Sequence, residues 1–326
     1  MYTVSASPHI HSRQGVNRIM YDVIIALMPA LVVSIIFFGL SALFITLLSV
    51  FSCVVIEFCI HKFLFKRTDF SVKDGSAVIT GMLLAFNVPS SVPWWMIIIG
   101  SVVAIGIAKM SFGGIGNNIF NPALIGRVFL LISFPVEMTQ WPTNSFNAVD
   151  GITGPTPLAL LKDGIMSGKN ILQIKGLPEY QDMFFGNIGG SLGEISALAI
   201  IIGGIYLLVR KVITWHIPII VLVSMFVFSG IFYLANPYMY INPLFHLLSG
   251  GAMLGAWFMA TDMATSPMTI KGQIIFAIGI GVITMVIRMF GAYPEGISFA
   301  ILLMNALVPL LNKISPERYG NNLKKK

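Results

Sequence analysis

Charged residues are scarce in this chain, and their scarcity excludes an ordinary soluble protein. Asp, Glu, Lys and Arg make up only 10% of the 326 residues, whereas hydrophobic residues make up 56%. Soluble domains carry about 25% charged residues. Together with a mean hydropathy of +0.86, this composition predicts an all-α, polytopic membrane protein whose architecture is a series of apolar spans.

Cysteine is also scarce, and the common catalytic motifs are missing. Cys53 and Cys59 are the two thiols, and their spacing suits neither a redox pair nor a zinc site. An iron–sulfur cluster held by this chain alone would need more thiolates. The sequence contains no P-loop, no G-x-S-x-G and no H-E-x-x-H pattern. Nothing therefore indicates an autonomous nucleotide-driven or hydrolytic enzyme, and we predict no metal site.

The amino-terminal segment MYTVSASPHIHSRQG lacks the apolar core of a cleavable signal peptide. We expect the first span to insert without cleavage. His9 and His11 lie in this segment; metal binding is one interpretation, and contact with a soluble partner subunit is the one we favour. The net charge of +7 is best explained by Lys and Arg on the cytoplasmic side, so we predict no nucleic-acid partner.

Ten apolar windows are candidate spans, and several are shorter than the ~20 residues that cross a bilayer. They are residues 20–39, 41–60, 76–88, 93–108, 119–134, 192–209, 217–234, 244–260, 273–290 and 296–312. Short spans flanked by Gly, Asn and Pro are typical of broken helices around a site near the bilayer midplane.

The distribution of basic residues predicts the orientation. With the amino terminus inside and ten crossings, the outer side holds only Lys162, Lys169 and Lys175, while the inner side holds nearly all other Lys and Arg residues. This asymmetry is the positive-inside pattern. It predicts both termini in the cytoplasm and places the connection 135–191 outside. Trp94, Trp95 and Trp141 fit anchors at the membrane interface.

A weak internal repeat predicts an inverted architecture. Residues 107–124, IAKMSFGGIGNNIFNPAL, and residues 286–303, VIRMFGAYPEGISFAILL, both run from a basic residue and Met through Phe-Gly into a new span. Five spans per half is an odd number, so the second copy must be inverted. Inverted repeats place sites at their interface. Chance similarity of glycine-rich turns remains an open alternative.

The predicted domains follow from this division. Residues 1–134 form an amino-terminal membrane half of five spans, residues 135–191 an extracytoplasmic loop, and residues 192–326 a second half of five spans.

The outer connection contains a helix start, DGITGPTPLALL, at residues 150–161. Asp150-Gly151 and Gly154-Pro155 are turn signals. Thr156 stands where an N-cap belongs, and Pro157 occupies the first helical position. The free N–H groups and positive dipole end of a helix start favour phosphate. Two interpretations remain: a bound anion, in one version esterified to Thr156, or a threonine that only caps its helix.

This segment resembles the flavin-attachment segment of the RnfD/NqrB family, membrane subunits of ion-translocating redox complexes. In that family a threonine carries FMN through a phosphoester bond; Thr156 matches it, and Thr153 matches the Ser/Thr that opens the motif. Pro155 replaces the commoner alanine. The stretches SPHIHS, GGIGNNIFNPAL, ATDMATSP and RMFGAYPEGISFAILLMNALVPL also resemble family motifs, in order along nearly the whole chain. The short segment before the first span favours the RnfD branch.

The resemblance implies a redox-driven translocase subunit that is inactive alone, in the inner membrane of a bacterium. FMN on Thr156 would exchange electrons with a flavin-bearing G subunit, and a second, non-covalent riboflavin would lie nearer the inner face. Membrane A and E subunits, soluble B and C subunits, ferredoxin and NAD would act at the level of the complex. The coupling ion would be Na⁺ or H⁺.

Other residues are candidates for the flavin sites. Asp150 and Gly154 flank Thr156 in the attachment segment. Arg127 lies within a span, where charge is costly and often functional; a flavin partner and a structural pair are both open. The amides of Asn118 and Asn121 suit the edge of a flavin ring, or a tight re-entrant turn.

Polar residues in the second half allow further interpretations. Asp262, with Thr261 and Thr265, would bind a cation or fix a helix end. We expect a structural ion pair between Arg288 and Glu295, and an interhelical hydrogen bond at His246.

A second function also fits part of the sequence. The triplet Asn121-Pro122-Ala123 and the inverted halves are similar to urea-type channels, so a solute channel or transporter is the alternative. The counterpart of the triplet reads MNAL, and a plain channel has no need of the outer helix start.

Overall fold

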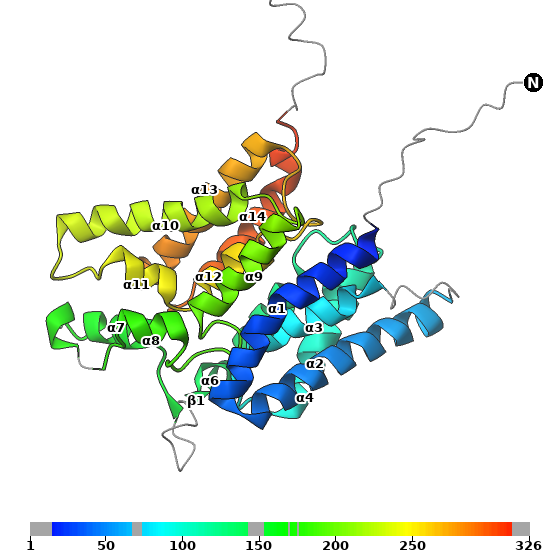
Figure 1. Ribbon diagram of the computed structural model, residues 1–326, viewed down its shortest axis with the longest axis horizontal. Coiled ribbons are helices and arrows are strands. Elements are labelled where there is room, and N and C mark those ends of the chain that lie inside the picture. Colours follow the sequence, from blue (N-terminus) through cyan, green and yellow to red (C-terminus); the bar gives the residue numbers. More distant parts are fainter. Residues whose placement is uncertain (1–14, 67–73, 143–152, 169, 175, 315–326) are drawn as a thin grey trace, which may run out of the picture.

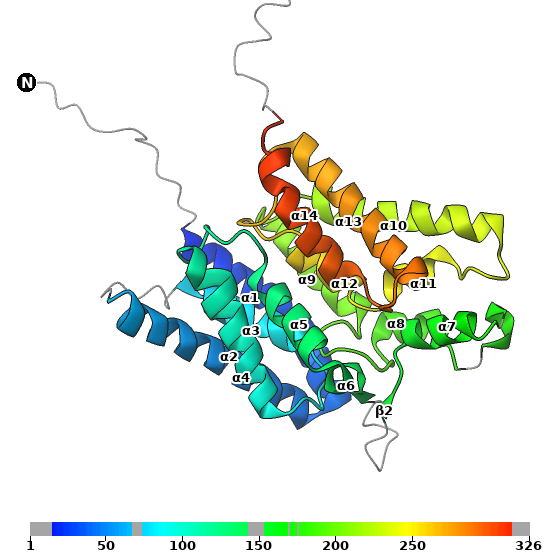
Figure 2. The ribbon, with the colours of Figure 1, turned by 180° about the vertical axis from the view of Figure 1, so that it is seen from behind.

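A computed structural model describes residues 15–66, 74–142, 153–168, 170–174 and 176–314. Its regular structure is almost entirely helical (Figures 1 and 2). Among the described residues, five helices are long and apolar enough to cross a membrane: Val16–Phe38, Leu40–Leu64, Trp94–Phe112, His216–Ala235 and Ile270–Phe290. Four shorter apolar helices accompany them. The chain is thus a multi-pass membrane protein, as its composition predicts.

The first half follows the predicted windows. Its elements are α1 (Val16–Phe38), α2 (Leu40–Cys59), η1 (Ile60–Leu64), α3 (Ser76–Phe86), α4 (Trp94–Ser101), η3 (Val102–Lys109), η4 (Met110–Phe112) and α5 (Pro122–Ser133). Gly39, with φ +69°, separates α1 from α2. The segments η1 and η3 are π-helices that continue α2 and α4, so two long helices end in wider turns, which are frequent at functional sites.

The connection between the halves has its own short elements. They are α6 (Pro135–Thr139), β1 (Trp141–Pro142), β2 (Thr153–Gly154), α7 (Pro157–Met166), η5 (Ile171–Gln173) and α8 (Tyr180–Phe185). The strands β1 and β2 pair antiparallel, with Trp141 opposite Gly154. Trp141 is only 7% exposed, so its predicted role as an interface anchor is wrong: the ring packs inside the protein. Trp94 and Trp95, at the start of α4, are exposed.

The second half contains α9 (Ala197–Val209), α10 (His216–Ala235), α11 (Pro243–Leu248), α12 (Ala252–Leu254), η6 (Gly255–Met259), α13 (Ile270–Phe290) and α14 (Ile297–Leu311). The predicted window 244–260 is a broken helix. It ends at Leu248 and resumes at Ala252, and Gly250 between them has φ +63°. A residue with a side chain rarely adopts this conformation, so the glycine fixes the break.

Glycines bring helix pairs into close contact. At the crossing of α1 and α9, a Cβ on Gly203 would overlap the backbone carbonyl of Ala26. A Cβ on Gly81 of α3 would likewise lie only 2.6 Å from the Val50 Cα in α2. Small residues at crossings are the usual means by which membrane helices approach each other. The largest buried apolar cluster includes residues of both halves, from Leu27 of α1 to Ile301 of α14.

The elements are arranged with a clear polarity (Figures 1 and 2). α1 begins and α14 ends at the same end of the molecule, while α6, α7, α8 and the two strands lie toward the opposite end. Large apolar side chains such as Phe51 of α2 and Leu234 of α10 are exposed, as expected of surfaces that face lipid.

Candidate functional site

Thr156 begins α7 in the manner predicted from the sequence. Its backbone is extended, its Oγ1 accepts a hydrogen bond from the Ala159 N–H at 3.2 Å, and Pro157 occupies the first turn. The side chain is only 3% exposed. The prediction of an N-cap is therefore confirmed, and the capping hydroxyl lies within the protein.

α7 is docked on the second half. Leu158, two residues after Thr156, is buried, and its Cδ1 lies 2.7 Å from where a Cβ would stand on Gly250. From the next turn, the Lys162 Nζ donates hydrogen bonds to the backbone oxygens of Gly291 and Tyr293. These two carbonyls belong to the connection between α13 and α14, so α7 contacts the second half at two places: the break after α11 and this connection.

The other residues of the attachment segment are placed only in part. Gly154 is half-buried and pairs through β2 with β1. Thr153 is the neighbouring residue of β2, opposite Pro142. Asp150 lies outside the described residues, as do His9 and His11.

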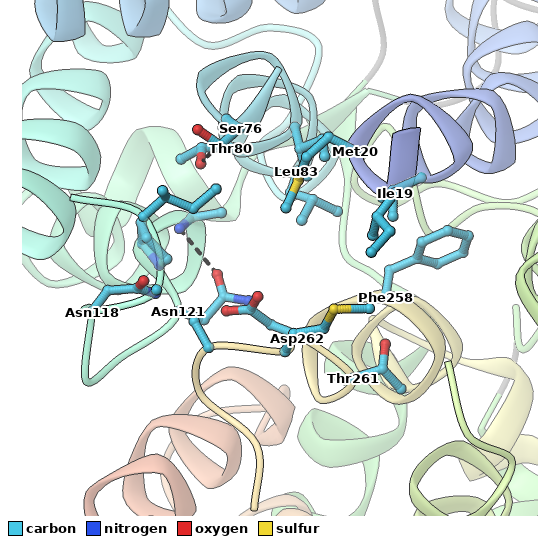
Figure 3. Close-up of a pocket in the computed structure, with 18 of the residues that line it drawn as sticks. Ile19, Met20, Ser76, Thr80, Leu83, Asn118, Asn121, Phe258, Thr261 and Asp262 are labelled. Carbon is cyan, nitrogen blue, oxygen red and sulfur yellow. Dashed lines mark hydrogen bonds between the residues drawn. The ribbon is translucent and has the colours of Figure 1, made fainter. Parts of the chain in front are cut away.

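A cavity of about 350 Å³ lies at the other end of the molecule, where α1 begins and α9 ends. Figure 3 shows Ser76 and Thr80 of α3 facing Asn121, Asp262 and Thr261 across this space, with Ile19 and Met20 of α1 and Phe258 of η6 at its edge. Its volume is within the ~300–1,000 Å³ typical of small-molecule sites. Mostly apolar walls with a few amides, hydroxyls and charged groups suit a largely apolar small molecule that carries some polar groups.

Asn121 joins the two halves at the wall of the cavity. Its Oδ1 accepts hydrogen bonds from the Ala123 and Leu124 N–H groups at 3.1 and 3.4 Å, which caps α5. Its Nδ2 donates to the Met259 backbone oxygen at 3.2 Å, at the end of η6. Asn118, which also lines the cavity, donates to the Phe120 oxygen. The two asparagines predicted as ring-edge ligands thus share one cavity.

Lys109 contributes a buried cation to the cavity wall. Its Nζ donates to Glu57 Oε2 at 2.7 Å and to Ser76 Oγ at 2.6 Å, and the side chain is 3% exposed. The sequence placed Lys109 only among the basic residues of the inner side and did not predict its buried ion pair. Its position as the basic residue of the repeated stretch IAKMSFGG was the signal that could have indicated it. The opposite wall carries Asp262, whose Oδ2 accepts a hydrogen bond from Thr265.

Arg127 lies apart from the cavity lining, in a buried polar cluster between the halves. Its guanidinium pairs with Glu295 Oε2 and donates to Ser298 Oγ. The expected ion pair between Arg288 and Glu295 is wrong. Arg288 donates instead to the backbone oxygens of His246 and Ser249. The carbonyls left free by the break after α11 take up this guanidinium, so Glu295 remains for Arg127.

Comparisons with known proteins agree in pointing to one family. A family model described as the NQR2, RnfD, RnfE family matches residues 3–320. The chain is 49% identical to the D subunit of the Na(+)-translocating ferredoxin:NAD(+) oxidoreductase complex of Acetobacterium woodii, over 98% of this chain and 95% of that protein. It is 42% identical to the D subunit of the proton-translocating ferredoxin:NAD(+) oxidoreductase complex of Clostridium ljungdahlii, over 98% and 96%. The D subunit of the ion-translocating oxidoreductase complex of Escherichia fergusonii is 38% identical, over 98% and 99%.

Proposed function

The chain belongs to the NQR2, RnfD, RnfE family, and from this premise we propose that it is the D subunit of a complex that couples ferredoxin:NAD(+) oxidoreduction to ion movement. The names of its relatives support this function, and both Na⁺ and H⁺ occur among them as the translocated ion. The subunit would act only within the assembled complex, beside the partner subunits that the resemblance implies. The names of these relatives do not favour a solute channel.

The proposed topology places ten helices in two inverted halves, 1–134 and 192–326, in a bacterial inner membrane with both termini in the cytoplasm. Three observations support it. The described ends of the chain lie on one side and α7 on the other. α2 packs on α4 as α10 packs on α13, and α5 contacts η3 as α14 contacts α13. The connection 135–191 is then the outer domain.

Thr156 is the proposed attachment point of FMN. A single observation carries this proposal: the hydroxyl that the family motif designates is the N-cap of a ten-residue helix outside the two membrane halves. The first backbone N–H groups of that helix have no intrahelical partners and favour the phosphate of an ester at this position. Because the hydroxyl is 3% exposed, we infer that attachment precedes the docking of α7 or requires its release.

The cavity beside Lys109 is the proposed site of the second, non-covalent flavin. Leu83, Ile19 and Phe258 would offer apolar contacts to a ring system, and Asn118 and Asn121 line the same cavity. A flavin bound at either place would supply one- and two-electron transfer. The chain's own contribution is to hold the two groups on opposite sides of the membrane and to set the charge around them.

Mass spectrometry tests the proposal most directly. We expect the peptide containing Thr156, from chain made in a host with the flavin transferase, to be heavier than its amino acids by one FMN phosphoester. A peptide of unmodified mass from that host would contradict the proposal.

Filling the cavity tests the second flavin. Leu83→Trp places a larger side chain in the cavity, and we expect the flavin released by denaturing extraction to fall to near zero while the covalent flavin remains. Ile202→Trp, at a half-exposed position of α9 outside the cavity, is the matched control and should keep both. Equal extractable flavin in the two variants would place the non-covalent site elsewhere.

A further inference from the structure

Glu194 is a buried carboxyl that neither flavin site uses. It lies in the connection just before α9, between the two halves, and is only 4% exposed. Its Oε1 accepts one hydrogen bond, from the Ser191 N–H at 3.1 Å. Its Oε2 is buried and has no hydrogen-bond partner among the described residues. An ionised carboxylate without a paired cation is costly to bury, so this environment favours the neutral acid.

The cations nearest to Glu194 are committed to other groups. Arg127 pairs with Glu295 and Ser298, and Arg288 donates to the carbonyls of His246 and Ser249. Glu295 also keeps one buried oxygen, Oε1, without a partner among the described residues. The cluster therefore holds two arginines and two carboxyls, of which only Glu295 has an arginine in contact within the described part of the chain.

The field at Glu194 comes from these same groups. Burial is the main effect that raises the pKa of Glu194, to about 7, and the Glu295 carboxylate raises it further while Arg127 opposes both. Arg288 interacts electrostatically with the same carboxyl, and His246 interacts in turn with Arg288. The neutral acid is therefore favoured over a wider pH range here than for an exposed glutamate.

Neighbouring glycines connect Glu194 to the helix that Thr156 begins. Glu194 Oε2 lies 3.0 Å from where a Cβ would stand on Gly251. A Cβ built on the adjacent Gly250 would lie within 4 Å of side-chain atoms of three residues: Leu158 of α7, Arg288 and Glu295. The Ser191 side chain also interacts with the Glu194 carboxyl, and its hydroxyl is buried beside it.

We propose that Glu194 is a proton-binding site of this subunit, positioned between the two halves to compensate negative charge gained at the start of α7. One proton adds to the carboxylate to give the neutral acid, and the same proton leaves when the acid ionises; no electron is transferred to Glu194. The proton binding stands on the geometry of this cluster. Its coupling to α7 rests on the proposed attachment of FMN to Thr156.

Infrared difference spectroscopy of the full chain in lipid nanodiscs tests the proton binding. Between pH 5 and pH 9 we expect a carboxylic-acid carbonyl band that is lost as pH rises, because burial and the Glu295 carboxylate raise the pKa of Glu194. Glu194→Gln should remove this band entirely. Glu179→Gln, at an exposed position before α8, is the matched control and should leave it intact. A band that survives in Glu194→Gln would overturn the proposal.

A second variant tests the interaction between the two carboxyls. Glu295→Gln removes the neighbouring negative charge, so the band of Glu194 should remain and titrate at lower pH. An unchanged midpoint would show that the two carboxyls do not interact, against the proposal.

The coupling has its own readout. Chemical reduction of the flavin-bearing chain should move the midpoint of the Glu194 band to higher pH, because added negative charge stabilises the acid. Thr156→Ala should keep the titration and lose this shift. If the Glu194 band titrates but its midpoint does not move on reduction, the coupling of Glu194 to α7 is overturned and the proton binding is not. A wild-type chain without flavin would contradict the proposed function, and the pH titration would still decide whether Glu194 binds a proton.

Discussion

Thr156→Asn is expected to abolish the covalent flavin while leaving the fold intact. Asparagine is as good an N-cap as threonine, since its side-chain oxygen accepts from the same backbone N–H groups, but it has no hydroxyl to esterify. Chain made with the flavin transferase should therefore lose its ultraviolet-excited fluorescence in denaturing gels completely. The Thr156 peptide mass should fall to that of the bare amino acids.

Three companion variants separate attachment from capping. Thr156→Ser keeps both the hydroxyl and the cap, so it should retain flavin. Thr156→Ala removes both and should cost about 0.5–2 kcal/mol of stability in addition, because the Ala159 N–H loses its acceptor. Thr153→Ala should keep the full fluorescence. Covalent flavin in Thr156→Asn, or its loss in Thr153→Ala, would show that another hydroxyl is the acceptor.

Arg127→Met is expected to cause the largest loss of stability among single substitutions in the polar cluster. It leaves Glu295, 9% exposed, as a buried carboxylate without its ion pair. Removal of one partner from a buried pair typically costs about 3–5 kcal/mol. We expect a clear fall in the thermal unfolding midpoint in nanodiscs and in the yield of folded chain. The variant Arg127→Met with Glu295→Gln removes both charges and should recover most of the loss.

Arg210→Met is the control for this prediction. Arg210 forms a bidentate contact with Asp22, but its side chain is 37% exposed, so water replaces much of what the mutation removes. Its effect should be far smaller than that of Arg127→Met. Equal effects of the two substitutions, or no recovery in the double variant, would mean that the Arg127 pair does not stabilise the fold.

Local signals predicted much of this fold because their physics is local. Thr156-Pro157 and Asn121-Pro122 are helix starts in the structure, since a capping oxygen followed by proline satisfies the first turn within a few residues. The apolar windows are also helical, because the length and hydropathy of a span are read from a single stretch of sequence. Gly250 explains why one of these windows is interrupted.

The pairing of buried charges was not predictable in this way. Arg127 in a span required a polar partner, but Glu295 lies 168 residues away in the sequence, and Arg288 was the nearer candidate. Glu295 pairs with Arg127 because Arg288 already donates to the backbone oxygens of His246 and Ser249, which the break after α11 leaves free. Glu57 and Lys109 are likewise 52 residues apart. No sequence pattern marked Glu194 as a candidate site, because its burial and its charged neighbours come from segments that are distant in the sequence.

The contacts of α7 and the strand before it with both halves have a mechanical consequence. The strand before it is joined to the end of the first half through β1, while Leu158 and Lys162 contact the second half. The helix therefore connects the two halves across the interface between them. In the proposed inverted-repeat topology, a rocking motion of one half against the other would displace Thr156, and with it the flavin that we propose to be attached there. A motion that accompanies ion movement would then change the distance over which electrons are transferred, and the ten-residue helix α7 would connect the two events.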